Sequence, residues 1–151
     1  YDPSMVPDLV APIAAGEADV VLASRMLGEP LKGGMPLYKY VANRFLTALE
    51  NLVLGTRFSE YHTGYRAFSR RALESVNFMF NSDNFIFDNE ILVQLVIRKM
   101  RLKEIPVPTR YAFDSSSVSF WSGARYGLGI LKTIAKYILH RLHLIRFKQF
   151  A

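Results

Sequence analysis

The stretch ADVVLAS, residues 18–24, is the part of the sequence that decides the fold. Its consecutive apolar and largely β-branched residues are typical of a strand that is buried on both faces of a sheet. Residues 4–15 precede it and predict a short helix, because Ser4 can cap the start and Gly16 suits the position after the end. A helix followed by a buried strand is the order of elements in an α/β sheet. The sequence therefore predicts an α/β fold.

Further elements are predicted on the C-terminal side of this strand. Residues 25–37 contain three glycines and two prolines, which indicates a surface loop. A helix is predicted next, because apolar residues recur there at helical spacing: Val41, Ala42, Phe45, Leu46, Leu49 and Val53. The later segments predict a strand at 65–68, a helical turn at 70–76, a loop at 77–85, a helix at 88–100 and a strand at 101–113. Two prolines, Pro106 and Pro108, confine the second half of that last strand to a sheet edge or a loop.

The composition indicates one globular domain. The chain has 151 residues, of which 50% are hydrophobic, and this is enough for a single core. It contains no cysteine, which excludes disulfide bonds and cysteine-ligated zinc. Charged residues interrupt the apolar stretches well short of the roughly 20 residues that a membrane-spanning helix needs. Because the chain begins with Tyr1 and its first residues do not resemble a signal peptide, we expect it to be a piece of a longer protein.

The excess of positive charge lies at the C-terminal end. Residues 120–151 contain six basic residues and no acidic one, whereas the first 119 residues contain thirteen of each. A helix is predicted within 126–147, with Lys132, Lys136 and His140 on one side and Leu131, Ile134, Ile138 and Leu142 on the other. Such a basic amphipathic helix either lies on an anionic membrane surface or covers the core with its apolar side. We therefore expect two parts, a domain at 1–119 and a basic helical tail at 120–151.

The segment SEYHTGYRAFSR, residues 59–70, gathers side chains that can carry chemistry. Glu60 can act as a general base, His62 can exchange a proton near neutral pH, and Arg66 can clamp a phosphate. Gly64 allows backbone geometry that is closed to other residues. The alternative is a polar turn that leads into a strand, in which His62 is a surface or packing residue.

Other candidates stand at the ends of predicted elements. Asp88 and Glu90 lie at the start of a helix, where either can deprotonate an acceptor, although the helix dipole alone also favours acidic residues there. Arg25 directly follows the buried strand, at the carboxyl end where α/β proteins bind ligands.

Arg110, near Ser116 and Ser117, can hold another phosphate or is a solvated residue at a strand end. The sequence contains no P-loop, dinucleotide-binding glycine pattern, His-x-x-x-His pair or serine-nucleophile elbow, and we predict no metal ligand within this chain. The basic tail lacks the interleaved aromatic residues of a recognised nucleic-acid module. We therefore expect no nucleic-acid partner.

Four blocks of the sequence resemble, in the right order, the C-terminal half of family-2 glycosyltransferases with the GT-A fold, close to the dolichyl- and polyprenyl-phosphate sugar transferases. These blocks are ADVVLASR (18–25), SEYHTGYRAFSRRAL (59–73), FDNEIL (87–92) and RLKEIPVPTRY (101–111). The resemblance covers residues 1 to about 119 and implies a partial GT-A fold that lacks the N-terminal nucleotide-binding half. In this family the missing half carries an Asp-x-Asp segment that holds Mg²⁺ or Mn²⁺ on the donor diphosphate.

The resemblance implies that the longer enzyme transfers a sugar from a nucleotide sugar to a lipid phosphate or a related acceptor, with inversion at the anomeric carbon. It implies that Glu60, Asp88 and Glu90 position or deprotonate the acceptor. His62, the arginines and the serines near Arg110 would bind substrate, with Arg25 facing the donor pocket. The dolichyl-phosphate enzymes usually carry Asp at the position of Glu60, which is longer by one methylene. Because the Asp-x-Asp half is absent, we expect the isolated chain to be inactive.

A second function class fits the same sequence: a non-catalytic interaction module at the membrane surface, derived from the same half-fold. In both cases we expect a cytoplasmic protein attached peripherally to the inner membrane surface. The reasons are that a lipid-linked acceptor is met at the bilayer surface and that the tail at 120–151 is basic.

Overall fold

Strand β1 (Val20–Ser24) is the central strand of a three-stranded sheet with the order β2-β1-β3. It pairs antiparallel with β2 (Arg66–Phe68) and parallel with β3 (Leu102–Pro106). All five residues of β1 are buried, which confirms the strand that the sequence predicts at this place. The computed structural model describes residues 1–108, Tyr111 and 120–150. Among these residues β3 is an edge strand that ends at Pro106, in agreement with the prolines of this segment.

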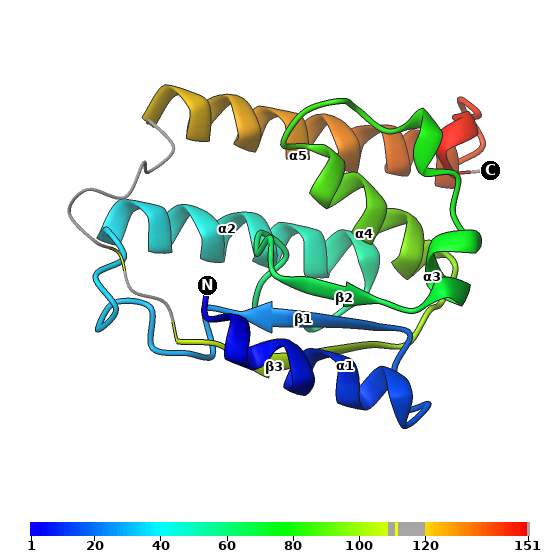
Figure 1. Cartoon of the computed structure of the whole chain (residues 1–151). Coiled ribbons are helices and arrows are strands. Elements are labelled where there is room, and N and C mark those ends of the chain that lie inside the picture. The colour runs from blue at the N-terminus through cyan, green and yellow to red at the C-terminus, as the bar shows by residue number, and fades with distance from the viewer. Residues whose placement is uncertain (109–110, 112–119, 151) are drawn as a thin grey trace.

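Helices cover both faces of the sheet (Figure 1). Helix α1 (Val6–Ala14) lies on one face, α2 (Leu37–Leu54) and α4 (Phe87–Ile97) lie on the other, and α5 (Phe120–Arg141) packs beyond them. The short elements are η1 (Pro3–Met5), α3 (Arg70–Glu74), η2 (Phe78–Phe80) and η3 (Lys148–Phe150). The molecule is therefore a small α/β fold with a mixed sheet and a long C-terminal helix.

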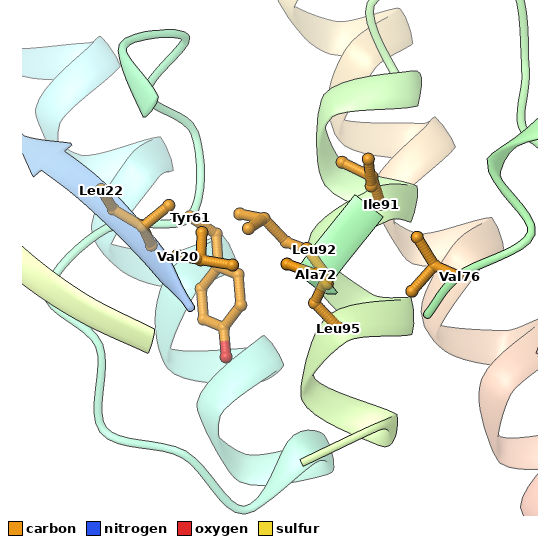
Figure 2. Packing of buried hydrophobic residues seen from close by; sticks show 8 residues of the cluster. All are labelled: Val20, Leu22, Tyr61, Ala72, Val76, Ile91, Leu92 and Leu95. Atoms are coloured by element: carbon orange, nitrogen blue, oxygen red, sulfur yellow. The ribbon is translucent and has the colours of Figure 1, made fainter. Parts of the chain in front are cut away.

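The core lies on both sides of β1, because successive side chains of a strand point to opposite faces. Val21 and Ala23 pack against Leu9 of α1. On the opposite face Val20 and Leu22 belong to a larger cluster (Figure 2), which also contains Tyr61, Ala72, Val76, Ile91, Leu92 and Leu95. The continuous apolar run of β1 thus fills two half-cores and fixes the position of the residues that follow the strand.

Helix α2 forms where the sequence predicts a helix, but not all of its apolar residues are buried. Val41 and Phe45 are 56% and 65% exposed, whereas Asn43, Thr47 and Glu50 are buried. The physical reason is that α2 packs against polar groups of the 59–62 segment and of α4, which need polar partners. The most deeply buried residues of α2 are therefore polar, and several of its apolar residues are exposed.

The tail helix α5 ends at Arg141 and does not continue to residue 147 as predicted. Ile130 and Ile134 are buried, and the Cβ of any larger residue at Gly129 would lie 2.1 Å from Ile86 Cδ1, so α5 packs closely against the segment that leads into α4. Leu131, Ile138 and Leu142, predicted on the same apolar side as Ile134, are 40%, 39% and 61% exposed. Helix α5 thus covers the core and also presents an apolar stripe to solvent. Within the described residues, no helix is both long and apolar enough to cross a bilayer.

Candidate functional site

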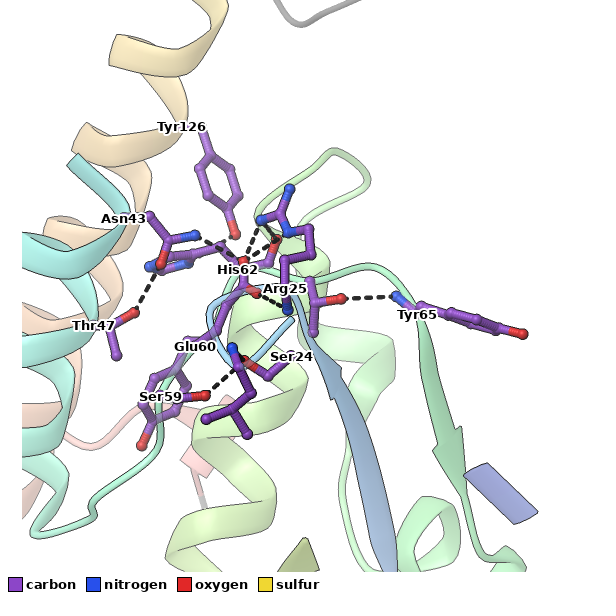
Figure 3. Close-up of polar contacts among 12 residues, drawn as sticks. Ser24, Arg25, Asn43, Thr47, Ser59, Glu60, His62, Tyr65 and Tyr126 are labelled. Atoms are coloured by element: carbon purple, nitrogen blue, oxygen red, sulfur yellow. Dashed lines mark hydrogen bonds and ion pairs between the residues drawn. The ribbon is translucent and has the colours of Figure 1, made fainter. Parts of the chain in front are cut away.

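Arg25 and Glu60 form a buried ion pair at the carboxyl end of β1 (Figure 3). One carboxylate oxygen of Glu60 accepts from the Arg25 backbone N–H at 2.7 Å, and the other accepts from Arg25 Nε at 2.9 Å and also from Nη2. Asn43 of α2 donates to the same oxygen at 2.7 Å. Glu60 is 0% exposed. The carboxylate therefore fixes the arginine that directly follows the strand.

The backbone around Glu60 is held by a second carboxylate, that of Glu104 on β3. Glu104 accepts from the backbone N–H groups of Ser59 and Glu60 at 2.9 to 3.1 Å and from the Ser59 hydroxyl at 2.7 Å. That hydroxyl also lies 2.6 Å from the hydroxyl of Ser24, the last residue of β1. Adjacent strands β1 and β3 thus hold the start of the 59–62 segment, and this explains how Glu60 reaches Arg25.

The guanidinium of Arg25 makes two hydrogen bonds besides those to Glu60. Its Nη2 donates to the backbone oxygen of His62 at 3.0 Å, and its Nη1 donates to the Tyr111 hydroxyl at 3.1 Å. The side chain keeps 19% of its surface exposed. Burial alone would lower the pKa of Arg25, but the hydrogen bonds and the charge of Glu60 raise it above its ordinary value. Arg25 is therefore a permanently charged, pre-oriented group of the kind that binds a phosphate.

His62 and Glu50 lie together in the buried polar interior of the site. His62 Nε2 is 3.3 Å from Glu50 Oε2, and His62 Nδ1 is 3.4 Å from the Tyr126 hydroxyl of α5. Asn89 of α4 donates to the other Glu50 oxygen. His62 Nε2 and Glu50 Oε2 have no well-directed hydrogen bond among the described residues.

Burial raises the pKa of Glu50 to about 8, against the smaller opposing effects of the Asn89 hydrogen bond and the Arg66 charge. Burial and the charges of Arg25 and Arg66 lower the pKa of His62 to about 3. At neutral pH the contact between Glu50 and His62 is therefore a neutral acid beside a neutral imidazole and not an ion pair. His62 is thus a buried residue of the site, and its predicted role in substrate binding stays a prediction.

Arg66 directs its donors to backbone oxygens. Its Nε and Nη2 donate to the carbonyls of Thr63 and Tyr61 at 2.6 and 2.9 Å, and Nη1 donates to the carbonyl of Asp88. The Asp88 carboxylate lies 3.9 Å from Nη1, with 52% of its side chain exposed. Burial holds the pKa of Arg66 below its ordinary value, although the nearby Asp88 charge partly opposes this effect. Arg66 thus fastens the 61–63 segment to the start of α4.

Glu90 lies in a different environment. It is buried and accepts from the Ser82 backbone N–H at 2.6 Å and from the Ser82 hydroxyl at 3.3 Å, and Lys136 Nζ of α5 is 3.8 Å away. No contact joins it to Glu60 or Arg25 within the described residues. The structure thus brings Arg25, Glu60, His62, Arg66 and Asp88 into one network and leaves Glu90 outside it. The catalytic role of Glu90 stays a prediction, and its contacts suit a structural role.

The Glu90 contacts give a stability prediction. We expect Glu90→Ala to lower the free energy of unfolding by about 1–3 kcal/mol, because the partly buried Ser82 N–H loses its charged acceptor. Asp83→Ala is the matched control, since Asp83 is an exposed acid next to Ser82 and its loss is expected to change stability by less than about 0.5 kcal/mol. Urea unfolding measures both, and equal effects would show that the Glu90 contacts do not stabilise the fold.

Several predicted residues cannot be placed. Arg110, Ser116 and Ser117 lie outside the described residues. In the parts of the chain that the structure does describe, no three histidine, aspartate or glutamate side chains come together as a metal site.

Sequence reasoning missed the residues that hold the site from other elements. They are Asn43, Glu50, Asn89, Glu104, Tyr111 and Tyr126. One signal for two of them was available: Asn43, Thr47 and Glu50 recur at i, i+4 and i+7, and so share one side of α2. The Thr47 hydroxyl lies 3.3 Å from Asn43 Oδ1, which makes this side a connected polar strip.

The known proteins that this chain is similar to include three archaeal glycosyltransferases. The chain is 34% identical over 108 residues to the low-salt glycan biosynthesis hexosyltransferase Agl6 of Haloferax volcanii, a match that covers 71% of this chain and 26% of that protein. The chain is related to archaeal glycosyltransferases. It is 27% identical over 111 residues to the UDP-N-acetylglucosamine–dolichyl-phosphate N-acetylglucosaminyltransferase of Methanococcus voltae, covering 74% of this chain and 44% of that protein. Glycosyltransferase AglD of Haloferax volcanii is 28% identical over 100 residues, which are 66% of this chain and 16% of AglD.

These relatives support the glycosyltransferase relationship that the four sequence blocks predict. The chain spans about a quarter of the length of Agl6 and less than half of the Methanococcus voltae enzyme. No protein-family model matches the chain. No solved structure matches it either.

Proposed function

We propose that this chain forms the acceptor-side part of a family-2 glycosyltransferase with the GT-A fold. The whole enzyme transfers a sugar from a nucleotide sugar to a lipid phosphate, such as a polyprenyl phosphate, with inversion at the anomeric carbon. The proposal is supported by the relationship to archaeal glycosyltransferases, one of which is named as a dolichyl-phosphate sugar transferase. The observation that carries it on this chain is the buried Arg25–Glu60 pair at the carboxyl end of β1.

The proposed reaction breaks the bond between the anomeric carbon and the donor phosphate oxygen and forms a bond to an acceptor phosphate oxygen. The leaving group is a nucleoside diphosphate. A phosphate acceptor is already ionised at neutral pH, so it needs little help from a general base. The main demand on the protein is electrostatic, namely to hold phosphates and to stabilise the charge that develops on the leaving group.

Arg25 meets this demand in the proposal. It faces the donor diphosphate. The Glu60 carboxylate positions it by accepting three hydrogen bonds, one from the Arg25 backbone and two from the Arg25 guanidinium. Asp88 is the exposed carboxylate of the network and is assigned to positioning the acceptor. A divalent cation, Mg²⁺ or Mn²⁺, belongs to the proposed whole enzyme. The described residues do not group three metal-ligating side chains, and no step is assigned to a metal bound by them.

A second candidate function is a non-catalytic module at the membrane surface. The observation in its favour is the exposed apolar stripe of the basic helix α5, which needs no catalytic residue to bind a bilayer. The partner in both proposals is an anionic membrane, reached from its cytoplasmic side through residues 120–151.

A transfer assay separates the two functions. The protein as its gene encodes it is incubated with membranes and with a panel of radiolabelled nucleotide sugars. We expect label to enter the lipid fraction from at least one donor and to be lost with Arg25→Gln, because the neutral side chain cannot hold a phosphate as an ion pair. Arg70→Gln, on an exposed arginine of α3, is the control and is expected to retain transfer. If no donor labels the lipid fraction while the protein still binds the membranes, the non-catalytic module is correct.

A further inference from the structure

Helix α5 packs on α2 and α4 with one of its sides. Four residues share this side, because they are spaced at i, i+4, i+7 and i+8: Tyr126, Ile130, Thr133 and Ile134. The last three of them are buried. Close approach is possible because Gly129 has no Cβ, which would lie 2.1 Å from Ile86 Cδ1. Packing along this side therefore fixes the position of α5.

The first residue of this side, Tyr126, points towards the interior of the candidate site (Figure 3). Its hydroxyl forms a hydrogen bond of 3.4 Å with His62 Nδ1, and the two rings meet edge to face with their centroids 5.7 Å apart. Burial raises the pKa of the Tyr126 hydroxyl above its ordinary value, so this hydroxyl stays protonated. Helix α5 thus contributes a polar group to the interior of the site.

The His62 side chain has a polar neighbour at each of its two ring nitrogens. Besides the Tyr126 contact at Nδ1, its Nε2 lies 3.3 Å from Glu50 Oε2, and Asn89 donates to the other oxygen of Glu50. Only 6% of the His62 side chain is exposed, so these contacts lie in a region of low dielectric constant, where they are stronger than in water. Three helices therefore determine where the imidazole lies: α2 through Glu50, α4 through Asn89 and α5 through Tyr126.

The backbone of His62 contacts the candidate phosphate-binding group. Its carbonyl oxygen accepts from Arg25 Nη2 at 3.0 Å, and the same nitrogen donates to Glu60. Because the imidazole and the carbonyl belong to one residue, a shift of the imidazole also shifts an acceptor of Arg25. The guanidinium of Arg25 is therefore connected to α5 through His62.

We infer that helix α5 is part of the transfer site and that Tyr126 is a positioning residue, which acts on Arg25 through His62. The inference rests on the proposed function, because it assigns Tyr126 to the same reaction. The Tyr126 hydroxyl keeps His62 in the place where its carbonyl accepts from Arg25, and the guanidinium is thereby held for the donor diphosphate. The predicted tail at 120–151 and the predicted domain at 1–119 thus act together.

Transfer kinetics with Tyr126→Phe test the inference on the protein as its gene encodes it. The variant keeps the aromatic ring and loses only the hydroxyl. Arg25 is assigned to the charge that develops on the leaving group, so we expect kcat to fall about tenfold and KM for the nucleotide sugar to change less than about twofold. Tyr137→Phe, on the same helix but packed against Phe150, is the control and is expected to keep both constants. Circular dichroism and thermal melting verify that each variant is folded.

A second variant distinguishes positioning from a general effect on the structure. In His62→Asn the connection to Arg25 is already broken, so we expect the further change Tyr126→Phe to alter kcat by less than about twofold. The imidazole nitrogen signals of isotope-labelled histidine report the contact itself by NMR. We expect the signals of His62 to shift in Tyr126→Phe and to stay in place in Tyr137→Phe.

The inference is overturned if Tyr126→Phe keeps kcat within about twofold of the unmodified protein, or if it lowers kcat by the same factor with and without His62. Unmoved His62 signals in Tyr126→Phe would also overturn it. If the unmodified protein transfers no sugar from any donor, the proposed function fails and the inference falls with it. If that protein transfers sugar and Tyr126→Phe does so at the same rate, only the inference fails.

Discussion

Replacing Glu60 by alanine is expected to lower the rate of sugar transfer by at least about a hundredfold, measured on the protein as its gene encodes it. Glu60 accepts hydrogen bonds from both the backbone and the side chain of Arg25, and its removal leaves this arginine without the group that orients it. Removing one partner of a buried ion pair also costs about 3–5 kcal/mol of folding free energy. We therefore expect a lower melting temperature together with the loss of activity.

Two further variants separate the chemical effect from the loss of stability. Glu60→Gln keeps the size of the side chain and is expected to fold, but its neutral amide cannot pair with Arg25 as a carboxylate does, so transfer should remain strongly reduced. Glu74→Ala removes an exposed glutamate of α3, paired with Arg70 at the surface, and is expected to change the rate by less than twofold. Near-normal turnover in Glu60→Gln and Glu60→Ala would show that the Arg25–Glu60 pair has no part in catalysis.

The second large effect is on the pH dependence of stability. Folding raises the pKa of Glu50 from 4.5 to about 8 and lowers that of His62 from 6.5 to about 3. Between pH 4.5 and 6.5 the two groups together carry one proton in both the folded and the unfolded chain, so they add no slope. From pH 6.5 to 8 the folded chain keeps a proton on Glu50 that the unfolded chain has lost, and stability falls as the pH rises.

The same two groups destabilise the fold below pH 4.5, where the unfolded chain binds two protons and the folded chain only one. The expected loss between pH 6.5 and 8 is about 2 kcal/mol, because one proton contributes about 1.4 kcal/mol for each pH unit. Urea unfolding across this range measures it. The double variant Glu50→Gln/His62→Asn removes both titrating groups, and we expect it to lose this decline. If the two proteins show the same profile, the pair does not titrate as described.

The fold was predictable because its strongest signal is local. The apolar run at 18–24 is too short for a buried helix and too continuous for a surface strand, and it becomes the central strand β1. Gly16, expected after the first helix, indeed has a positive φ of 71°, a conformation that glycine adopts readily. Boundaries were less predictable. The loop at 77–85 contains the 3-10 helix η2, and α5 ends at Arg141 because the chain turns back and buries Phe150.

The candidate site was predictable only in its list of residues. Arg25 and Glu60 were each singled out from their own surroundings, but their pairing across 35 positions depends on Glu104 and Ser24, which hold the 59–62 segment against β1 and β3. The orientation of α2 was not predictable from its apolar spacing. Its polar side faces Glu60, and the spacing of apolar residues alone does not tell which side of a helix lies inside.

The most direct measurement of the central claim uses two defined acceptors that differ only in the phosphate. The protein as its gene encodes it is incubated with a nucleotide sugar and either polyprenyl phosphate or the corresponding polyprenol, and the products are identified by mass spectrometry. We predict a polyprenyl phosphate that carries one added sugar, and no product from the alcohol. Equal transfer to the alcohol, or transfer to neither lipid while another acceptor is glycosylated, would contradict the assignment of a lipid-phosphate sugar transferase.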